Sequence, residues 1–494
     1  MNVVLILLDT LNRHYLSCYG NTWMQTPNIQ RLADRSLVFD NHFTGSLASM
    51  PARHELFSGR KEFLWRGWGH AEPFDDNLAK LAAAQGAYTC IRTDHAHYWD
   101  RSHGYGYTEH FEDRHFVRGQ EGDRPIKRHV TEDELPQWVL SLARYYPMDI
   151  CMRYYRNMMD FETAEDFQSA QVMRAAAEAI DGNASRDKFY IQAEGFDPHE
   201  PWFNPEPYRS MYGPYRDDVP CWLPYPGLPV ANEYFANVTT EELEAVRQQY
   251  AGNVSMVDHQ VGKVLDALDR NDLWKDTVVI LTTDHGQELG ERGRCSKCYP
   301  HYNLHAHIPL IIWHPDHPGP RRTNAYSNMV DIHSTIVDVM GDADYRAPHG
   351  RSLLSVIRGE QEQVRNGVLY GFWGTGACWV DDDYTIFSGY DNEKVTPLYY
   401  STMIRRSIPQ PQAEAGRFMP DVDHPLWRYP VPPERGTPTD VRMPLQIYAR
   451  ADHDQLEDLS ADEKIAEDCR QCLRAALDEE TCPPEAYRRF MLEP

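Results

Sequence analysis

Two short apolar runs from opposite halves of the chain each end in a carboxylate. The first run, residues 3–8, is followed by Asp9. The second run, residues 277–283, is rich in β-branched side chains and is followed by Asp284 and His285. Such runs are typical of strands buried in a parallel sheet. Because open α/β sheets bind ligands at the carboxyl ends of their strands, we expect an α/β fold with ionisable groups gathered at one edge.

A third predicted strand, residues 88–92, runs into a polar loop that carries Thr93, His95 and His97. If this strand joins the same parallel sheet, the loop lies at the same edge as the carboxylates. Two histidines on a loop also fit a simple solvated turn, so the segment alone supports both interpretations.

Two further loops carry basic side chains after predicted strands. His199 follows the predicted strand at residues 188–193 and has prolines on both sides. Proline restricts its own backbone and that of the residue before it, so His199 is held at a fixed loop position, which favours a functional histidine. Lys297, His301 and His305 lie on the loop that follows the second apolar run.

The segment Ser49-Met50-Pro51-Ala52-Arg53 places a hydroxyl, a proline and an arginine at the start of a predicted helix. Proline is favoured in the first helical turn, so Ser49 is expected at the helix N-terminus, where unpaired N–H groups favour anions. Arg53 adds a positive charge one turn further along. The alternative is that Ser49 only caps the helix.

Taken together, these segments make the chain resemble the sulfatases of the alkaline phosphatase superfamily and their relatives, the phosphonate monoester hydrolases. The resemblance covers most of the chain. It rests on the N-terminal strand with Asp9, on Ser49-x-Pro51-x-Arg53 followed by Ser58-Gly59-Arg60, on Asp197-Pro198-His199, on Thr283-Asp284-His285-Gly286, and on Lys297 ahead of Ile308-Pro309-Leu310-Ile311. It implies an α/β fold with a large central, mostly parallel sheet flanked by helices.

The resemblance implies that Ser49 is converted to formylglycine, whose hydrated aldehyde attacks the sulfur of a sulfate ester. The modification requires a formylglycine-generating maturase as a partner. Ser49 is either the natural serine form of the motif, matured by an enzyme that acts on serine, or a replacement for cysteine.

Residue by residue, the resemblance assigns one divalent cation to Asp9, Asp284, His285 and the modified Ser49. His70 is a further candidate ligand, because it lies where the phosphonate monoester hydrolases have an asparagine near the metal. Oxygen-rich ligand sets suit Ca²⁺ or Mg²⁺, and a histidine ligand also permits Mn²⁺; we expect Ca²⁺.

The resemblance also assigns catalytic roles to four basic residues. Arg53 stabilises the formylglycine, His95 matches a histidine of the family, and Lys297 binds the sulfate. His199 is the expected general acid for the leaving alcohol, since a histidine pKa near neutrality suits that role; Lys297 is able to share it. The predicted substrate-binding residues are Thr93, His97, His301 and His305.

The chain departs from the family pattern at two positions. The family often has a second acidic residue directly after the first aspartate, whereas this chain has Thr10, so the site is one carboxylate short. Thr93 stands where the family has a lysine, which removes one positive charge.

Composition limits the partners and the compartment. The 49 Lys and Arg residues against 74 Asp and Glu residues give a net charge of −25, which argues against nucleic acid or an anionic membrane as the main partner. The first apolar run is too short, and lacks the basic flank, for a signal peptide, and no apolar segment reaches a membrane-spanning length. With ten cysteines and no secretion signal, we expect reduced thiols and a cytoplasmic protein.

The pattern along the chain predicts two parts. Residues 100–160 lack periodicity and predict an irregular region that shapes a cleft. Near residue 365 the pattern changes to short aromatic strands separated by turns, which predicts a small antiparallel sheet followed by a final helix. We expect a catalytic domain at 1–365 and a C-terminal subdomain at 366–494.

The predicted function is hydrolysis of a sulfate monoester of a sugar or a small aromatic alcohol. A phosphonate or phosphate ester hydrolase is the rival enzyme, which Thr10, Thr93 and His285 favour. The third alternative is a binding protein in which Ser49 is never modified.

Overall fold

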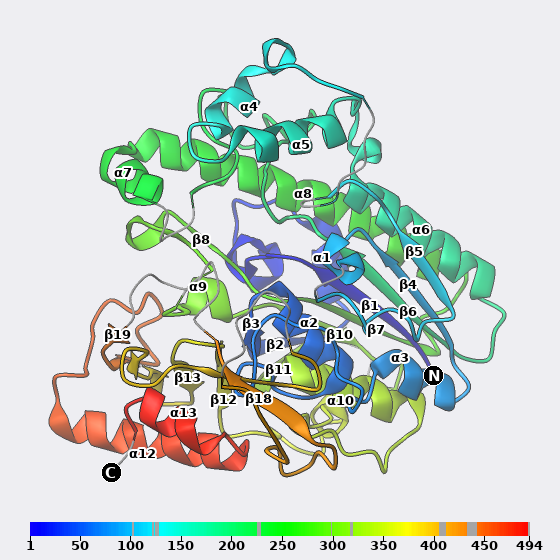
Figure 1. Cartoon of the computed structure of the whole chain (residues 1–494). Helices are drawn as coiled ribbons and strands as arrows, with labels where there is room; N and C mark the ends of the chain where they lie inside the picture. The colour runs from blue at the N-terminus through cyan, green and yellow to red at the C-terminus, as the bar shows by residue number, and fades with distance from the viewer. Residues whose placement is uncertain are drawn as a thin grey trace.

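The computed structural model describes residues 1–100, 103–120, 123, 128–224, 229–297, 299–316, 320–404, 412–431 and 442–492. Within these residues, eight strands form the central sheet (Figure 1). In spatial order they are β11 (Arg321–Asn328), β2 (Leu37–Phe43), β10 (Leu310–Trp313), β7 (Thr277–Thr283), β1 (Asn2–Leu8), β6 (Phe189–Gly195), β4 (Tyr88–Thr93) and β5 (Asp113–Phe116). Strand β10 runs antiparallel to both neighbours, whereas the other pairs are parallel, so the predicted mostly parallel sheet is confirmed.

The register at the centre of the sheet brings the predicted site residues to one level. Leu8, the last residue of β1, lies opposite Thr283 of β7 on one side and Gly195 of β6 on the other. The next residues of β1 and β7 are Asp9 and Asp284, so two carboxylates leave the same edge side by side.

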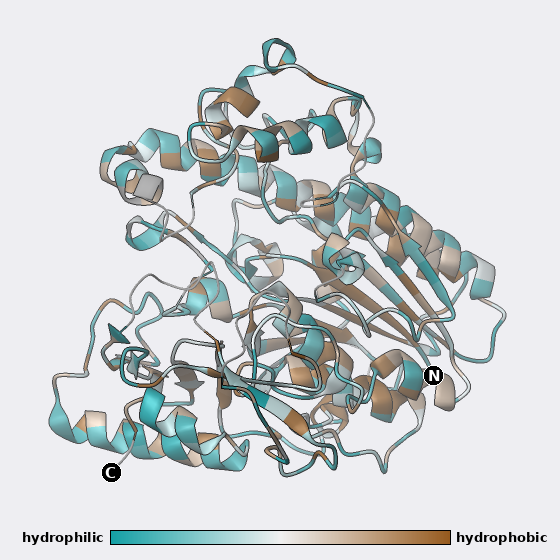
Figure 2. Ribbon diagram, in the orientation of Figure 1, coloured by the Kyte–Doolittle hydropathy of each residue, from teal (hydrophilic) through white to brown (hydrophobic). Residues whose placement is uncertain are grey.

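Helices cover both faces of this sheet because alternate side chains of β1 point to opposite faces. Val4, Ile6 and Leu8 share a hydrophobic cluster with α1 (Pro27–Ala33), α6 (Gln168–Asn183) and α8 (Thr240–Arg270). Val3, Leu5 and Leu7 share another with α2 (Ser49–Ser58), α3 (Leu78–Ala84) and α10 (Met329–Met340). Figure 2 shows the hydrophobic residues concentrated along the central strands between these layers.

Residues 137–158 were predicted to be irregular, and that prediction is wrong. They form α4 (Gln137–Leu142) and α5 (Met148–Met158), which lie above α8 in Figure 1. Their apolar side chains pack around Trp222 and reach Met256 of α8. This packing partner lies far away in the sequence, so local periodicity does not reveal it.

The C-terminal region contains the predicted small sheet. Five strands of the described chain lie in the order β20 (Gln446–Ala449), β14 (Tyr384–Phe387), β13 (Ala377–Val380), β12 (Val368–Phe372) and β3 (Ser46–Leu47). The first four are antiparallel, as predicted, whereas β3 runs parallel to β12. Because β3 directly precedes α2, this sheet is continuous with the segment that carries Ser49. The domain boundary near residue 365 stays a prediction.

The remaining helices and strands lie outside these two sheets and the helices already named. The other helices are α7 (Pro229–Asn237), α9 (Asn303–Ala306), α11 (Leu354–Ile357), α12 (Glu463–Glu479), which is the predicted final helix, and α13 (Pro484–Arg489), with 3-10 turns at Arg13–Tyr15, Ser17–Tyr19, Ala96–Trp99, Glu132–Glu134, Ala164–Asp166 and Glu291–Gly293. The other strands are β8 (Glu288–Leu289), β9 (Cys295–Ser296), β15 (Tyr390–Asp391), β16 (Leu398–Ser401), β17 (Glu414–Gly416), β18 (Leu426–Pro430) and β19 (Arg442–Met443). Among the residues that the structure describes, none of the helices has both the length and the apolar character needed to cross a membrane.

Candidate active site

Three predicted ligands meet at the carboxyl edge of the sheet. One potential ligand atom from each of Asp9, Asp284 and His285 lies within 4.8 Å of the other two, and all three residues are buried. The Nδ1 atom of His285 lies 2.9 Å from the carbonyl oxygen of Gly286 and therefore carries the proton, which leaves Nε2 free to bind a metal. Two carboxylates and a neutral imidazole form a ligand set that suits a divalent cation.

Backbone N–H groups and the guanidinium of Arg53 hold Asp284 in its ionised form. Its Oδ1 atom accepts hydrogen bonds from the backbone N–H of Thr10 at 3.1 Å and of His285 at 2.8 Å. Burial alone would raise the pKa of Asp284, but His285, Arg53 and these donors outweigh burial and hold the pKa below its usual range. The carboxylate is therefore charged at neutral pH.

Ser49 is the first residue of α2, as the sequence predicts. The residue that caps the helix is Ala48, and the Oγ atom of Ser49 lies 3.3 Å from Nε2 of His285. The alternative that Ser49 serves only as a cap is therefore wrong. Its side chain points to the candidate metal ligands.

Arg53 lies one helical turn after Ser49 and contacts three carboxylates of the described residues. Its Nη1 atom donates to Oδ2 of Asp284 at 2.6 Å and to the carbonyl oxygen of Ser49 at 3.0 Å. Its Nη2 atom donates to Oδ2 of Asp9 at 3.0 Å, and its Nε atom donates to Oε1 of Glu194 at 2.6 Å. Burial alone would lower the pKa of Arg53, but the carboxylates raise it well above its usual value.

Glu194 is a site residue that sequence reasoning missed. It lies inside the fully buried strand β6 and also accepts hydrogen bonds from the hydroxyl of Tyr98, at 3.0 Å, and from Nε2 of Gln192, at 2.8 Å. The signal available in the sequence was a charged residue within an otherwise buried parallel strand, where a carboxylate needs a partner.

His199 and Lys297 come from different loops and meet in the structure. The Nζ atom of Lys297 lies 2.5 Å from Nε2 of His199 and 3.3 Å from Oε1 of Glu200. The Nδ1 atom of His199 lies 2.8 Å from the carbonyl oxygen of Glu200 and so donates to it. Nε2 of His199 is therefore the acceptor of a hydrogen bond from Nζ of Lys297.

His95 is buried, and both of its ring nitrogens lack a hydrogen-bond partner within the described part of the chain. Burial lowers the pKa of His95 well below its usual range, and Arg53 lowers it further, so the ring is neutral. The hydroxyl of Thr93 accepts from the backbone N–H of His95 at 3.0 Å, so Thr93 helps to hold this loop. The ring of His97 lies 5.1 Å from that of His95, between centroids.

His301 and His305 form a buried pair beside the candidate metal ligands. Their Nδ1 atoms lie 3.1 Å apart, and the ring centroid of His305 is 5.3 Å from that of His285. Burial lowers the pKa of both rings well below the usual value, so both are neutral.

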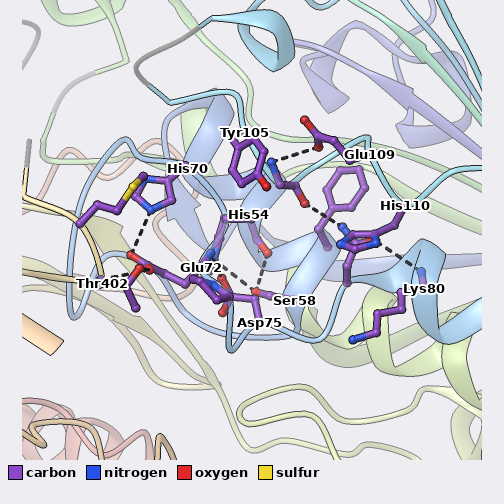
Figure 3. Close-up of a pocket in the computed structure, with 16 residues that line it drawn as sticks. His54, Ser58, His70, Glu72, Asp75, Lys80, Tyr105, Glu109, His110 and Thr402 are labelled. Carbon is purple, nitrogen blue, oxygen red and sulfur yellow. Dashed lines mark hydrogen bonds and ion pairs between the residues drawn. The ribbon is translucent and has the colours of Figure 1, made fainter. Parts of the chain in front are cut away.

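His70 does not join the three metal ligands. Its Nε2 atom lies 3.6 Å from Oε1 of Glu72. It lines a separate cavity of about 350 Å³ together with His54 and Asp75 (Figure 3). The position that the resemblance assigned to it is therefore not borne out by the geometry, because the loop after α2 turns this side chain toward Glu72.

The same cavity borders a buried charge cluster with a testable effect on stability. His54 lies 2.7 Å from Glu62 and 2.7 Å from Asp75; burial alone would lower its pKa, but these carboxylates raise it to about 9. Between pH 6.5 and 9 the native state therefore keeps a proton that the unfolded chain loses. As the pH rises from 6.5 to 9, the free energy of unfolding of the wild type should fall relative to that of the variant His54→Gln, by up to about 1.4 kcal/mol per pH unit. Urea denaturation at several pH values measures this; parallel curves for the two proteins would contradict it.

The sequence of this chain matches the model of a known protein family. The Sulfatase family model matches residues 1–342, so the chain belongs to the sulfatase family. Human iduronate 2-sulfatase is 26% identical over 361 residues, which cover 64% of this chain and 60% of that protein. Choline-sulfatase of Rhizobium meliloti is 25% identical over 362 residues, which cover 69% of this chain and 67% of that protein.

The fold is similar to that of a solved structure. The crystal structure of the phosphonate monoester hydrolase of Agrobacterium radiobacter superposes with a TM-score of 0.66 and 20% identity, and the match covers 97% of this chain and 95% of that one. The chain nevertheless spans only 60% of the length of the iduronate 2-sulfatase that it matches.

Proposed function

We propose that this protein is a sulfatase that hydrolyses a sulfate monoester through a formylglycine formed from Ser49 and one divalent cation. The observation that carries the proposal is the position of Ser49, at the N-terminus of α2 and 3.3 Å from His285. The test is to express the protein beside a maturase that acts on serine and to compare its turnover of 4-nitrophenyl sulfate with that of an aryl phosphonate. Faster turnover of the phosphonate would overturn the assignment.

Asp9, Asp284, His285 and the modified Ser49 would hold the cation, and we favour Ca²⁺ over Mg²⁺ and Mn²⁺. A bound divalent cation polarises the sulfuryl oxygens and lowers the pKa of the nucleophile. Arg53 contacts two of these ligands, Asp9 and Asp284, and the carbonyl oxygen of Ser49, so it would hold the formylglycine in place.

His199 and Lys297 would supply the proton for the leaving alcohol. Because Nε2 of His199 accepts from Lys297, the shared proton lies between these two nitrogens. This pair of side chains can deliver that proton to the departing oxygen and be reprotonated from solvent. Glu200, 3.3 Å from Nζ of Lys297, keeps the ammonium in place.

Replacing His199 with Ala should affect substrates according to their leaving group. Alkyl sulfates need a proton at the departing oxygen, so kcat should fall by about 10²- to 10⁴-fold, whereas 4-nitrophenyl sulfate should lose far less. Steady-state kinetics with both substrates measure the difference. His259→Ala, a change at an exposed histidine of α8, is the matched control. Equal losses with both substrates would rule out the acid role.

A sugar or a small aromatic alcohol is the proposed leaving group. The iduronate 2-sulfatase and choline-sulfatase relatives support a sulfate ester, and their names differ in the alcohol. We propose that Thr93, His97 and the His301–His305 pair line the site for the alcohol. Cytoplasmic location, and the lack of nucleic-acid and membrane partners, stay predictions.

A phosphonate or phosphate ester hydrolase is the second candidate. The absence of a carboxylate at Thr10 and the likeness to a phosphonate monoester hydrolase favour it. The comparison of aryl sulfate with aryl phosphonate separates the two enzymes. An unmodified Ser49 with no turnover of either ester would favour the third alternative, a binding protein.

A further inference from the structure

Glu194 is a carboxylate at a position where the fold gives it no access to solvent. It lies in β6 between Leu7 of β1 and Thr93 of β4, and it is fully buried. A buried carboxylate is strongly destabilising unless a cation and hydrogen-bond donors face it. Its position therefore requires a reason beyond packing.

The partners of Glu194 are donors from three elements. Arg53 donates from Nε at 2.6 Å, Tyr98 donates its hydroxyl at 3.0 Å, and Gln192 donates from Nε2 at 2.8 Å. An ionised carboxylate only accepts hydrogen bonds, so this set of partners stabilises the charged form. Burial raises the pKa of Glu194 above its usual value, whereas Arg53, Gln192 and Tyr98 act to lower it. The ionised carboxylate is the form that balances the charge of Arg53.

The guanidinium of Arg53 separates Glu194 from the candidate metal ligands. Nε lies on one edge of the planar group and contacts Glu194. Nη1 and Nη2 contact Asp284 and Asp9. Glu194 does not belong to the group that can hold the metal. It therefore acts on the site through Arg53.

Arg53 and a divalent cation compete for the same two carboxylates. Asp9 and Asp284 must serve both Arg53 and a divalent cation, and position 10 adds no carboxylate. Thr10 instead donates its hydroxyl to Oδ1 of Asp9 at 2.7 Å. Without Glu194, the positive charge of Arg53 would oppose the cation at both aspartates. With Glu194, Arg53 is neutralised from its far side, and the two aspartates remain available to the cation.

We propose that Glu194 is a positioning residue that neutralises and holds Arg53, so that Asp9 and Asp284 can bind a divalent cation in a site without a carboxylate at position 10. The inference rests on the proposed function only in so far as the site holds a cation. It does not depend on which ester is hydrolysed.

Calcium binding to the metal-stripped full-length protein tests the inference. Titration calorimetry with CaCl₂ should show that Glu194→Gln, which keeps the shape and removes the charge, weakens affinity by about 10- to 100-fold. Tyr98→Phe removes a hydrogen bond to the same carboxylate but no charge, and should weaken affinity much less. Wild-type affinity in Glu194→Gln, or an equal loss in both variants, would overturn the inference.

A rescue variant separates the charge effect from a folding defect. Adding Thr10→Asp to Glu194→Gln restores a carboxylate and should recover most of the calcium affinity. Thr10 has a φ of 61°, a backbone conformation that aspartate adopts more readily than a β-branched residue, so the change adds no strain. A general structural defect would not be rescued, and failure of the double variant to bind more tightly than Glu194→Gln would also count against the inference.

These outcomes are independent of the test of function. If the wild type hydrolyses no sulfate ester but Glu194→Gln still loses calcium affinity, the proposed function fails and this inference stands. If the wild type hydrolyses a sulfate ester but Glu194→Gln keeps its calcium affinity, the proposed function stands and this inference fails.

Discussion

Replacing Ser49 with Ala should lower kcat for sulfate ester hydrolysis by about 10⁵- to 10⁶-fold, because the variant lacks the atom that becomes the nucleophile. Ser49 lies at the start of α2, beside His285. Asp9, Asp284 and His285 remain in the variant, so calcium binding should persist in weakened form. Steady-state kinetics and calorimetry on the same preparation measure both properties.

The matched control is Ser58→Ala, a change at the last residue of the same helix. The hydroxyl of Ser58 donates to the carbonyl oxygen of His54 at 2.6 Å and makes no contact with the candidate metal ligands. Because this hydroxyl does not touch the candidate metal ligands, its loss should leave kcat close to the wild-type value. Substantial activity in Ser49→Ala would refute the role of Ser49 as nucleophile.

Replacing Asp284 with Ala should abolish calcium retention and activity together. Asp284 supplies one of the two carboxylates of the candidate metal group. It also accepts hydrogen bonds from the backbone of Thr10 and His285 and from Arg53. The substitution therefore removes a ligand and leaves buried donors unpaired, so kcat should fall by at least about 10³-fold. Metal content by mass spectrometry and kinetics measure both effects.

Two companion variants sharpen this test. Asp284→Asn keeps the shape and one acceptor oxygen but removes the charge, so a similar loss of calcium would assign the effect to charge. Asp272→Ala changes an aspartate whose side chain is 82% exposed, and it should leave metal content and kcat unchanged. Near wild-type activity in Asp284→Ala would refute the metal site.

The ends of the central strands were the part of the site that the sequence could predict. Buried parallel strands have a distinct composition, and their carboxyl ends meet at one edge. Asp9 and Asp284 were therefore identified together, and the register of β1 with β7 places them side by side. Ser49 was predicted at a helix start because of Pro51, and α2 begins there.

Contacts that depend on loop paths could not be predicted. The pairing of His199 with Lys297 joins two loops far apart in the sequence, and the position of His70 depends on how its loop turns toward Glu72. The predicted strand ends at residue 193, whereas β6 continues to Gly195 and buries Glu194, and nothing in the residue spacing shows that this carboxylate contacts Arg53. Residue spacing gives no side-chain direction in such segments.

The mass of the tryptic peptide at residues 36–53 tests the central claim most directly. After expression beside a maturase that acts on serine, the peptide should be two hydrogen atoms lighter than the encoded sequence, because oxidation of Ser49 to formylglycine removes them. Fragmentation should locate the change at Ser49. A peptide that keeps the mass of unmodified serine, in a preparation that hydrolyses sulfate esters, would contradict the formylglycine mechanism.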